Sequence, residues 1–271
     1  MSAAPVPAGS RAYVDASMDA VELLPVHGGR AAVFCAPRPE KKGPNEDAAL
    51  VATIDPACTL LAVADGAGGM RGGDRASRIA IERVRERLAE AEPEDARARL
   101  VSALEDAHHS ILSLGLGAAT TFAGVLIDEQ RLRSVHVGDS VVLVMGQRGR
   151  KRLQTVSHSP VGYAVEAGIL DEREALDHED LHLVSNLLGV GDPRIEISTE
   201  LELNPRDTVV IGSDGLFDNV VVSEIVEAVR KGDLLDVTVA LVERTLSRMV
   251  DPAAGRPSKP DDLSMIVYRP D

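Results

Sequence analysis

The sequence lacks residues on which several classes of protein depend. Its 271 residues include no tryptophan, and aromatic residues make up 2% of the chain. Proteins that bind single-stranded nucleic acid stack the bases on aromatic side chains, so this composition argues against that class. Acidic residues outnumber basic ones, 43 to 29, and the net charge of −14 opposes binding to nucleic-acid phosphates and to anionic membrane surfaces.

Cysteine and long apolar runs are scarce as well. Each of the two cysteines, Cys35 and Cys58, adjoins an apolar run, which predicts buried thiols rather than a disulfide framework. The opening MSAAPVPAGSR has no apolar stretch of signal-peptide length, and no run approaches the ~20 residues of a membrane-spanning helix. These features predict a cytoplasmic protein whose partners include neither membranes nor nucleic acid.

The composition predicts a globular domain with mixed secondary structure. Hydrophobic residues make up 44% of the chain, enough for a chain of this length to bury a core. Residues 1–10, rich in Ala, Pro and Gly, are expected to form a flexible N-terminal tail, and residues 11–271 a single domain. Apolar runs bounded by Gly, Pro or Asp predict strands, and apolar residues at helical spacing predict helices. The expected strands are 31–35, 48–54, 60–64, 120–128, 132–137, 141–145, 153–156, 195–203, 208–211 and 263–268, and the expected helices are 74–90, 94–114, 162–167, 171–177, 223–230 and 234–250.

Aspartates stand where these strands begin or end. Asp65, Asp139 and Asp214 each close an apolar run, whereas Asp47 and Asp261 precede one. Short turns between strands favour antiparallel sheets with helices outside, in which the end of one strand lies beside the start of its neighbour. The carboxylates would therefore meet and repel one another unless a hard cation, Mg²⁺ or Mn²⁺, is bound. Asp and Gly also end strands simply because they form turns, but so many such sites favour a metal centre.

A glycine-rich loop, Asp65-Gly66-Ala67-Gly68-Gly69, joins a predicted strand to the first long predicted helix. Glycines let the backbone approach a ligand and expose its carbonyl and amide groups. A tight connection between strand and helix would use the same residues, so the loop alone does not separate the two interpretations.

Taken together, the motifs resemble a known family. They occur in the order Asn45-Glu46-Asp47, Asp65-Gly66-Ala67-Gly68-Gly69, Gly138-Asp139-Ser140, Gly212-Ser213-Asp214-Gly215-Leu216-Phe217-Asp218 and Asp261-Asp262-Leu263-Ser264. The chain from about Pro44 to Tyr268 is similar to the metal-dependent serine/threonine protein phosphatases (type 2C, the PPM family), and most of all to the small bacterial type. The resemblance implies an α+β fold in which two antiparallel β-sheets pack as a sandwich flanked by pairs of antiparallel helices. Residues 11–271 would then form a single phosphatase catalytic domain.

The resemblance also implies a cofactor, two Mn²⁺ or Mg²⁺ ions at the core. Asp65 would bridge the ions, the carbonyl of Gly66 would help to hold the second, and Asp214 and Asp261 would complete the shell of the first. A hydroxide between the ions would attack phosphorus directly, which makes Asp65, Asp214 and Asp261 the expected catalytic residues.

Other acidic residues take supporting roles in the same scheme. Glu46 and Asp47 would act on the metal ions through bound waters. Asp139 would join Asp214 in holding a third, weaker ion. The expected partners are proteins carrying phosphoserine or phosphothreonine, including protein kinases or their substrates.

The sequence departs from the family at the position whose side chain binds the substrate phosphate. Lys42 replaces the arginine that usually stands three residues before Asn45. We assign Lys42 to substrate binding and catalysis, although a lysine lacks the two-pronged guanidinium, and Arg38 is the other candidate. The histidine that follows Asp-Gly in many eukaryotic members is Ala67 here.

Two other functions stay open at this point. The chain would be a pseudophosphatase, or a phosphoprotein-binding signalling module with little turnover, if the replacement at Lys42 abolishes catalysis. It would be a hydrolase of small phosphate esters if its site accepts metabolites rather than proteins.

The segment 157–188 corresponds to a flap beside the site in the family and is expected to influence the choice of substrate. It carries His158, which is expected either to contact the substrate or to lie at the surface, and the surface position is favoured. His108 and His109, inside the helix predicted over 94–114, are expected on a solvated helix face.

Overall fold

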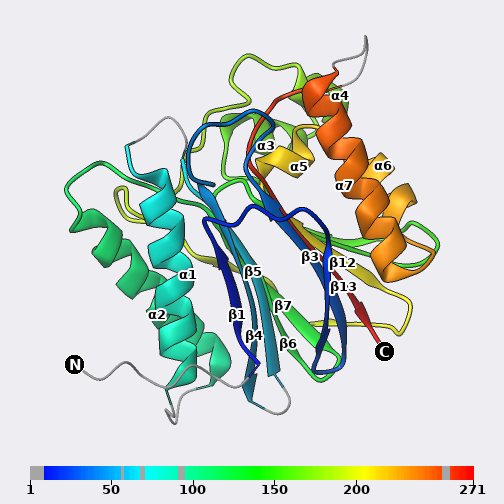
Figure 1. Cartoon of the computed structure of the whole chain (residues 1–271), viewed down its shortest axis with the longest axis horizontal. Helices are drawn as coiled ribbons and strands as arrows, with labels where there is room; N and C mark the ends of the chain where they lie inside the picture. Colours follow the sequence, from blue (N-terminus) through cyan, green and yellow to red (C-terminus); the bar gives the residue numbers. More distant parts are fainter. Residues whose placement is uncertain (1–8, 56–57, 68–70, 91–94, 252–256) are drawn as a thin grey trace.

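The computed structural model of the chain describes residues 9–55, 58–67, 71–90, 95–251 and 257–271. The expected flexible tail falls mostly outside the described residues, as do Gly68 and Gly69 of the glycine-rich loop. Within the described part, two antiparallel sheets lie face to face between helices (Figure 1).

The first sheet has seven strands in the order β1-β4-β5-β6-β7-β10, and β11 also pairs with β7. Every neighbouring pair in it is antiparallel. Its strands are β1 (Arg11–Val14), β4 (Asp47–Asp55), β5 (Cys58–Asp65), β6 (Phe122–Asp128), β7 (Arg131–Val137), β10 (Glu196–Ile197) and β11 (Leu201–Glu202).

The second sheet has six strands in the order β2-β3-β13-β12-β8-β9, again all antiparallel. The last strand of the chain therefore lies in the middle of this sheet, between β3 and β12. The strands are β2 (Glu22–Val26), β3 (Gly29–Ala36), β8 (Val141–Met145), β9 (Lys151–Gln154), β12 (Thr208–Gly212) and β13 (Leu263–Pro270).

Helices cover the outer faces of both sheets. Figure 1 shows the long helices α1 (Gly73–Ala89) and α2 (Ala96–Leu112) beside the first sheet. It shows the long helix α7 (Leu234–Val250) with the shorter α6 (Val222–Val229) beside the second sheet, and further short helices gathered at one end of the sandwich. These further helices are α3 (Pro160–Glu166), α4 (Glu172–Leu176) and α5 (Asp214–Phe217).

Strand alternation builds a core on each side of each sheet. On β4, Ala48 and Leu50 pack toward the helices, whereas Ala49 and Val51 pack between the sheets. Because successive side chains of a strand point to opposite faces, a strand buried on both faces is apolar throughout. This explains the unbroken apolar runs of the sequence.

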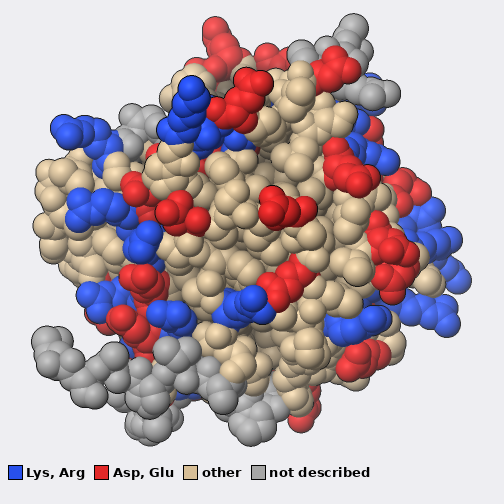
Figure 2. All heavy atoms as spheres, viewed as in Figure 1, with Lys and Arg blue, Asp and Glu red and all other residues tan. Residues whose placement is uncertain are grey.

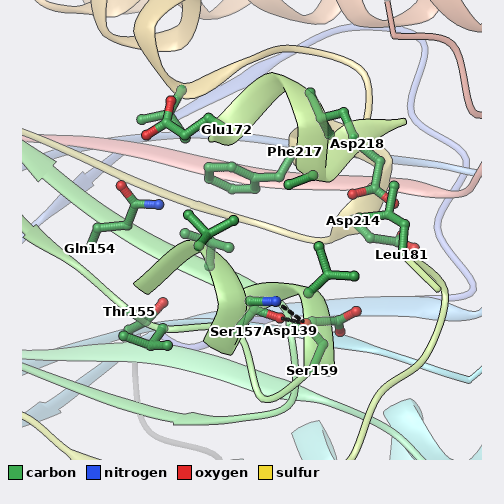
Figure 3. A pocket seen from close by; sticks show the side chains of 18 of the residues that line it. Asp139, Gln154, Thr155, Ser157, Ser159, Glu172, Leu181, Asp214, Phe217 and Asp218 are labelled. Atoms are coloured by element: carbon green, nitrogen blue, oxygen red, sulfur yellow. Dashed lines mark hydrogen bonds between the residues drawn. The ribbon is translucent and has the colours of Figure 1, made fainter. Parts of the chain in front are cut away.

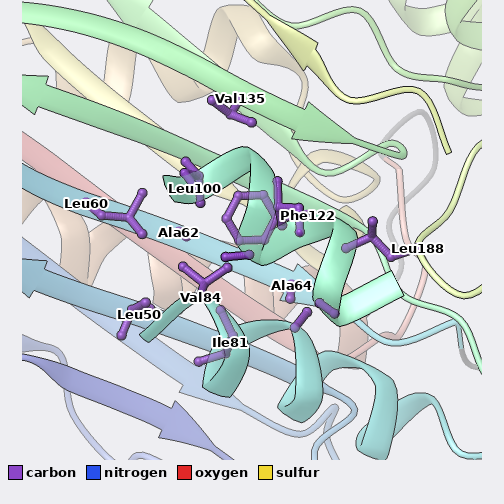
Figure 4. Packing of buried hydrophobic residues seen from close by; sticks show 14 of the residues in the cluster. Leu50, Leu60, Ala62, Ala64, Ile81, Val84, Leu100, Phe122, Val135 and Leu188 are labelled. Atoms are coloured by element: carbon purple, nitrogen blue, oxygen red, sulfur yellow. The ribbon is translucent and has the colours of Figure 1, made fainter. Parts of the chain in front are cut away.

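The layer between the first sheet and its helices is shown in Figure 4. Leu50 and Leu60 of neighbouring strands meet Ile81 and Val84 of α1, and Phe122 of β6 lies among them. A third cluster fills the space between the second sheet and α6 and α7. The sheets are thus held rigidly, and so are the strand ends that carry the aspartates.

The predicted α+β class with two antiparallel sheets is confirmed. The first two strands, β1 and β2, were not predicted, because both are short and β2 contains Pro25. The segment 195–203 was predicted as one strand, but it forms the two short strands β10 and β11 instead. Acidic and basic side chains are interspersed on the face shown in Figure 2. In the described part of the chain, no helix is long and apolar enough to cross a membrane.

Candidate metal centre

The ends of β4 and β5 bring the first acidic side chains together. Asp47 at the start of β4 is the register partner of Asp65 at the end of β5. The ladder continues one step further, since the Gly66 amide donates to the Glu46 carbonyl at 3.1 Å. A Cβ on Gly66 would lie 2.3 Å from the carbonyl oxygen of Gly73, so a glycine is required for the start of α1 to approach this closely.

Neighbouring hydroxyl groups fix the backbone of Asp65. Its carbonyl accepts from the Thr120 hydroxyl at 2.8 Å and from the Thr121 amide at 2.8 Å, and its amide donates to the Thr121 hydroxyl at 3.0 Å. The same Thr121 hydroxyl is 2.7 Å from that of Ser140. Asp65 is thereby connected to the turn after β7, which carries Asp139.

The second sheet supplies the remaining acids. Asp214 follows β12 and is the first residue of α5. Beside it, the Ser213 hydroxyl donates to Oδ2 of Asp47 at 2.7 Å, which joins the two sheets at the site. A Cβ on Gly215 would lie 2.0 Å from the carbonyl oxygen of Asp262. The glycine therefore lets α5 lie against Asp261 and Asp262, the two residues that precede β13.

The carboxylates raise one another's pKa values. Burial raises the pKa of Asp47 and Asp65 well above the usual range, and the charge of Asp214 adds to it. Burial and the charge of Asp214 likewise raise the pKa of Asp139 to about 7 and that of Asp261 to about 6. Such a group of ionised carboxylates is unfavourable without a cation among them. The donors are all oxygen atoms, which suits Mg²⁺ or Mn²⁺, so the residues fit the expected cofactor.

Sequence reasoning missed Asp218 as a member of this cluster. Burial and the charge of Asp214 raise the pKa of Asp218 to about 7. Asp218 caps the C-terminus of α5, one helical turn after Asp214. The spacing of four residues between Asp214 and Asp218 could have indicated this in the sequence, because residues four apart lie on the same face of a helix.

Sequence reasoning also missed Lys259, whose ammonium group lies among these acids. Its Nζ is 2.6 Å from Oδ2 of Asp214, 2.7 Å from Oδ2 of Asp218 and 3.8 Å from Oδ2 of Asp261. Burial alone would lower the pKa of Lys259, but the charges of Asp214 and Asp218 raise it above the usual value. The ammonium is therefore a permanent positive charge inside the cluster.

The backbone of Lys259 is held in place by a buried side chain. Asn219 donates from Nδ2 to the Lys259 carbonyl at 2.7 Å and accepts the Lys259 amide on Oδ1 at 2.8 Å. Asn219 is fully buried just after α5, and its Nδ2 also donates to the Gly215 carbonyl at 2.9 Å. The position of Lys259 thus depends on the same turn that places Asp214.

The two neighbouring lysines differ in their contacts. Lys41 places Nζ 2.8 Å from Oε2 of Glu46 and 2.6 Å from Oδ2 of Asp262. Lys42 is exposed, and the structure does not bring it into this network. Asp262 accepts further from the amides of Glu46, at 2.7 Å, and Arg38, at 2.9 Å. Lys41 therefore balances the charge of Asp262, and Glu46 points toward Lys41.

The structure thus brings together most of the residues singled out in the sequence. They are Asp47, Asp65, Gly66, Asp139, Asp214 and Asp261, with Glu46 at the edge of the group. It does not bring in Lys42, and it adds Asp218, Lys259 and Lys41.

Comparisons with known proteins show the family to which the chain belongs. The family model described as "Protein phosphatase 2C" matches residues 38–251. The serine/threonine phosphatase stp of Listeria monocytogenes is 26% identical over 218 residues, covering 70% of this chain and 86% of the relative.

Two solved structures have the same fold. The Mycobacterium tuberculosis serine/threonine phosphatase PstP/Ppp is 26% identical, with a TM-score of 0.73, covering 90% of this chain and 99% of that one. The catalytic domain of the serine/threonine protein phosphatase PstP, solved in complex with two manganese ions, is 25% identical with a TM-score of 0.69, covering 89% of this chain and 97% of that one. The chain therefore belongs to the protein phosphatase 2C family of metal-dependent serine/threonine protein phosphatases.

Proposed function

We propose that this chain hydrolyses phosphoserine and phosphothreonine esters in proteins with two Mn²⁺ or Mg²⁺ ions at the carboxylate cluster. The observation that carries the proposal is the convergence of aspartates from both sheets, with Asp47 buried and Asp65, Asp139 and Asp261 half-buried, each with a pKa raised by desolvation and by the charge of Asp214. Residues 11–271 act as one catalytic domain, and its partners are phosphoproteins, including protein kinases or their substrates.

The resemblance to the family assigns the ligand roles. Asp65 and the Gly66 carbonyl would hold the second ion, and Asp65, Asp214 and Asp261 would hold the first. Glu46 and Asp47 would act through water, and Asp139 would share a third, weaker ion with Asp214. When bound, the ions lower the pKa of a water and neutralise charge on the phosphoryl oxygens.

The contribution of the chain itself is rigid positioning. The Asp65 backbone is fixed by Thr120 and Thr121, and Asp47 is held by Ser213 across the two sheets. Groups held in place before the substrate arrives need no reorganisation during the reaction, which is the main source of electrostatic catalysis. Lys42 remains our proposed phosphate contact, since its exposed side chain is free of the carboxylate network that engages Lys41.

The test is hydrolysis of a phosphothreonine peptide by the purified chain with Mn²⁺, with Mg²⁺ and with a chelator. Asp214→Asn should lower kcat at least ~100-fold, as expected for loss of a principal electrostatic group. Asp128→Asn is the matched control, because this exposed aspartate ends β6 at the opposite end of the first sheet. Near-normal turnover of Asp214→Asn at saturating Mn²⁺ would rule out the assignment.

One observation favours the pseudophosphatase alternative, the Lys259 ammonium 2.6 Å from Asp214. In that case the chain binds phosphoproteins without hydrolysing them. Mn²⁺ binding by calorimetry with no phosphopeptide turnover would identify it. Turnover of small phosphate esters without phosphopeptide turnover would instead identify a metabolite hydrolase.

A further inference from the structure

A hollow opens directly beside the carboxylates (Figure 3). Its volume is about 450 Å³, within the range of roughly 300–1,000 Å³ that is usual for ligand pockets. Figure 3 shows Asp139, Asp214 and Asp218 on one side of it, Gln154 and Glu172 on the opposite side, and Phe217 between them. The hollow is therefore continuous with the proposed metal centre.

Half-buried apolar side chains line the hollow. They come from separate elements that meet here, namely α3, α4 and the segment after it, α5, the start of α6 and the segment after β9. The half-buried members are Val156, Val165, Leu176, Leu181, Phe217 and Val222. Apolar surface that is partly in contact with water favours an apolar ligand, because binding removes that surface from water.

The charges around the hollow select against acidic ligands. Besides the three aspartates, Glu166 and Glu172 lie in its walls. Among the described residues that line the hollow, Lys151 is the one basic residue, and its Nζ is already 2.8 Å from Oε1 of Glu172. The bound ions and Lys259 offset the charge of the three aspartates, but beyond them an acidic side chain would meet Glu166, and the described lining residues include no unpaired cation to receive it.

We propose that this hollow is a specificity pocket for the protein substrate. It binds a large apolar side chain that lies within two residues of the phosphorylated serine or threonine. Asp139 and Asp214 belong both to the metal centre and to the pocket wall, so a peptide bound by its phosphate reaches the pocket within one or two residues, at roughly 3.3 Å per extended residue. The inference rests on the proposed phosphatase function and adds the class of substrate.

The test compares phosphothreonine peptides that carry Leu, Ala or Glu at each of the two positions on either side of the phosphothreonine. An aryl phosphate without flanking residues serves as the reference substrate. At saturating Mn²⁺, we expect kcat/KM to be at least about tenfold higher for Leu than for Ala at one of these positions, the discrimination that an apolar pocket provides. Glu at the same position should be poorer than Ala.

Two pocket variants locate the preference. Val165→Trp narrows the pocket and should remove most of the difference between the Leu and Ala peptides. Leu176→Ala enlarges the pocket and should shift the preference from Leu to Phe, which keeps the test decisive if Val165→Trp fails to fold. Ile169→Ala, at a residue 74% exposed just after α3 and outside the pocket, is the control and should keep the wild-type preference.

The outcomes separate the pocket from the phosphatase function. Hydrolysis of the aryl phosphate and of all peptides at equal kcat/KM would overturn the pocket and leave the phosphatase function standing. A preference for Glu, or a Leu preference that both pocket variants retain, would also overturn it. Absence of any Mn²⁺-dependent hydrolysis, of aryl phosphate or peptide, would overturn the phosphatase function itself.

Discussion

Lys259 donates to Oδ2 of Asp214 at 2.6 Å, and Asp214 is the aspartate whose charge raises the pKa of Asp47, Asp65, Asp139 and Asp261. An ammonium group in this position compensates part of the negative charge that a metal ion would otherwise compensate. The carboxylate of Asp214 would therefore be shared between the chain's own cation and any ion that Asp139 and Asp214 hold.

The first prediction concerns this competition. Lys259→Met keeps much of the side-chain volume but removes the charge, so an additional Mn²⁺ should bind without displacing an ammonium group. We expect its affinity to rise at least about tenfold, since a hydrogen bond between charged groups is worth roughly 1.5–3 kcal/mol. Calorimetric titration with Mn²⁺ measures both affinity and stoichiometry.

The matched control for this change is Lys231→Met, at an exposed lysine between α6 and α7. It should bind Mn²⁺ as the wild type does. If Lys259→Met also binds Mn²⁺ with unchanged affinity and stoichiometry, Lys259 does not compete with a metal ion.

The second prediction separates the two adjacent lysines. Lys41→Ala leaves Asp262, with a side chain 4% exposed, without its counter-ion, and breaking such a pair costs about 3–5 kcal/mol. Lys42→Ala removes an exposed side chain, so its free energy of unfolding should change by no more than ~0.5 kcal/mol. Its kcat/KM should fall by the equivalent of roughly 1.5–3 kcal/mol if Lys42 contacts the phosphate.

Urea unfolding and phosphopeptide hydrolysis measure these two effects independently. Wild-type kcat/KM in Lys42→Ala would remove Lys42 from substrate binding and make Arg38 the next candidate. Unchanged stability of Lys41→Ala would show that the contact between Lys41 and Asp262 contributes little.

The meeting of acidic strand ends was predictable from sequence because it follows from local patterns. Asp47 and Asp65 lie at the outer ends of two consecutive apolar runs, and antiparallel pairing of these runs places the two residues side by side. Lys259 was not predictable in this way. It lies in a loop without periodic pattern, and its position depends on Asn219, forty residues earlier in the chain.

The burial of two histidines could not be predicted from the sequence either. His108 and His158 were expected at the surface, but both are buried, and this expectation was wrong. Nδ1 of His108 accepts the Gly189 amide at 3.0 Å, and Nδ1 of His158 accepts the Gly138 amide at 3.1 Å. The segments that cover these side chains are distant in sequence, so helix periodicity and local composition contain no sign of them.

The third prediction follows from the position of His158. Its amide donates to the Gly138 carbonyl at 2.9 Å while its ring accepts the Gly138 amide, so His158 holds the turn that carries Asp139. Since Nδ1 accepts, Nε2 carries the proton and is 3.4 Å from Oε2 of Glu196. His158→Ala should weaken the third, weaker metal site while the two core ions still bind.

Mn²⁺ titration of His158→Ala by calorimetry tests this role. His182→Ala, at an exposed histidine of the same segment, is the control and should leave all sites unchanged. Loss of the two core ions in His158→Ala, or an unaltered weak site, would contradict a role confined to the Asp139 turn.

The last prediction concerns the pH dependence of stability without metal. Burial and Asp214 raise the pKa of Asp139 to about 7, against about 3.9 for an unfolded aspartate. Between these values the folded state binds a proton that the unfolded state has released. The contribution of Asp139 to stability is therefore fully present below pH ~4 and is lost as the pH rises through ~7.

The buried histidines have the opposite effect. Burial lowers the pKa of His136 and His158 to about 4, so their contribution to stability rises with pH between ~4 and ~6.5. The dependence of wild-type stability on pH therefore combines the loss due to Asp139 with the gain due to the two histidines. The difference between Asp139→Asn and the wild type cancels the histidine effect, because both proteins retain His136 and His158.

We therefore compare the free energy of unfolding of Asp139→Asn with that of the wild type in chelator. The difference should shift in favour of the variant by at least ~1 kcal/mol from pH 5 to pH 8, an amount that a change of less than one pKa unit would produce. Urea unfolding at both pH values measures this difference. Saturating Mn²⁺ should reverse its sign at pH 8, since ionised Asp139 then binds a metal ion that asparagine holds poorly, and ligands that bind the folded state stabilise it. A difference that shrinks as the pH rises in chelator would show that Asp139 is already ionised at pH 5, without the raised pKa that its burial beside Asp214 implies.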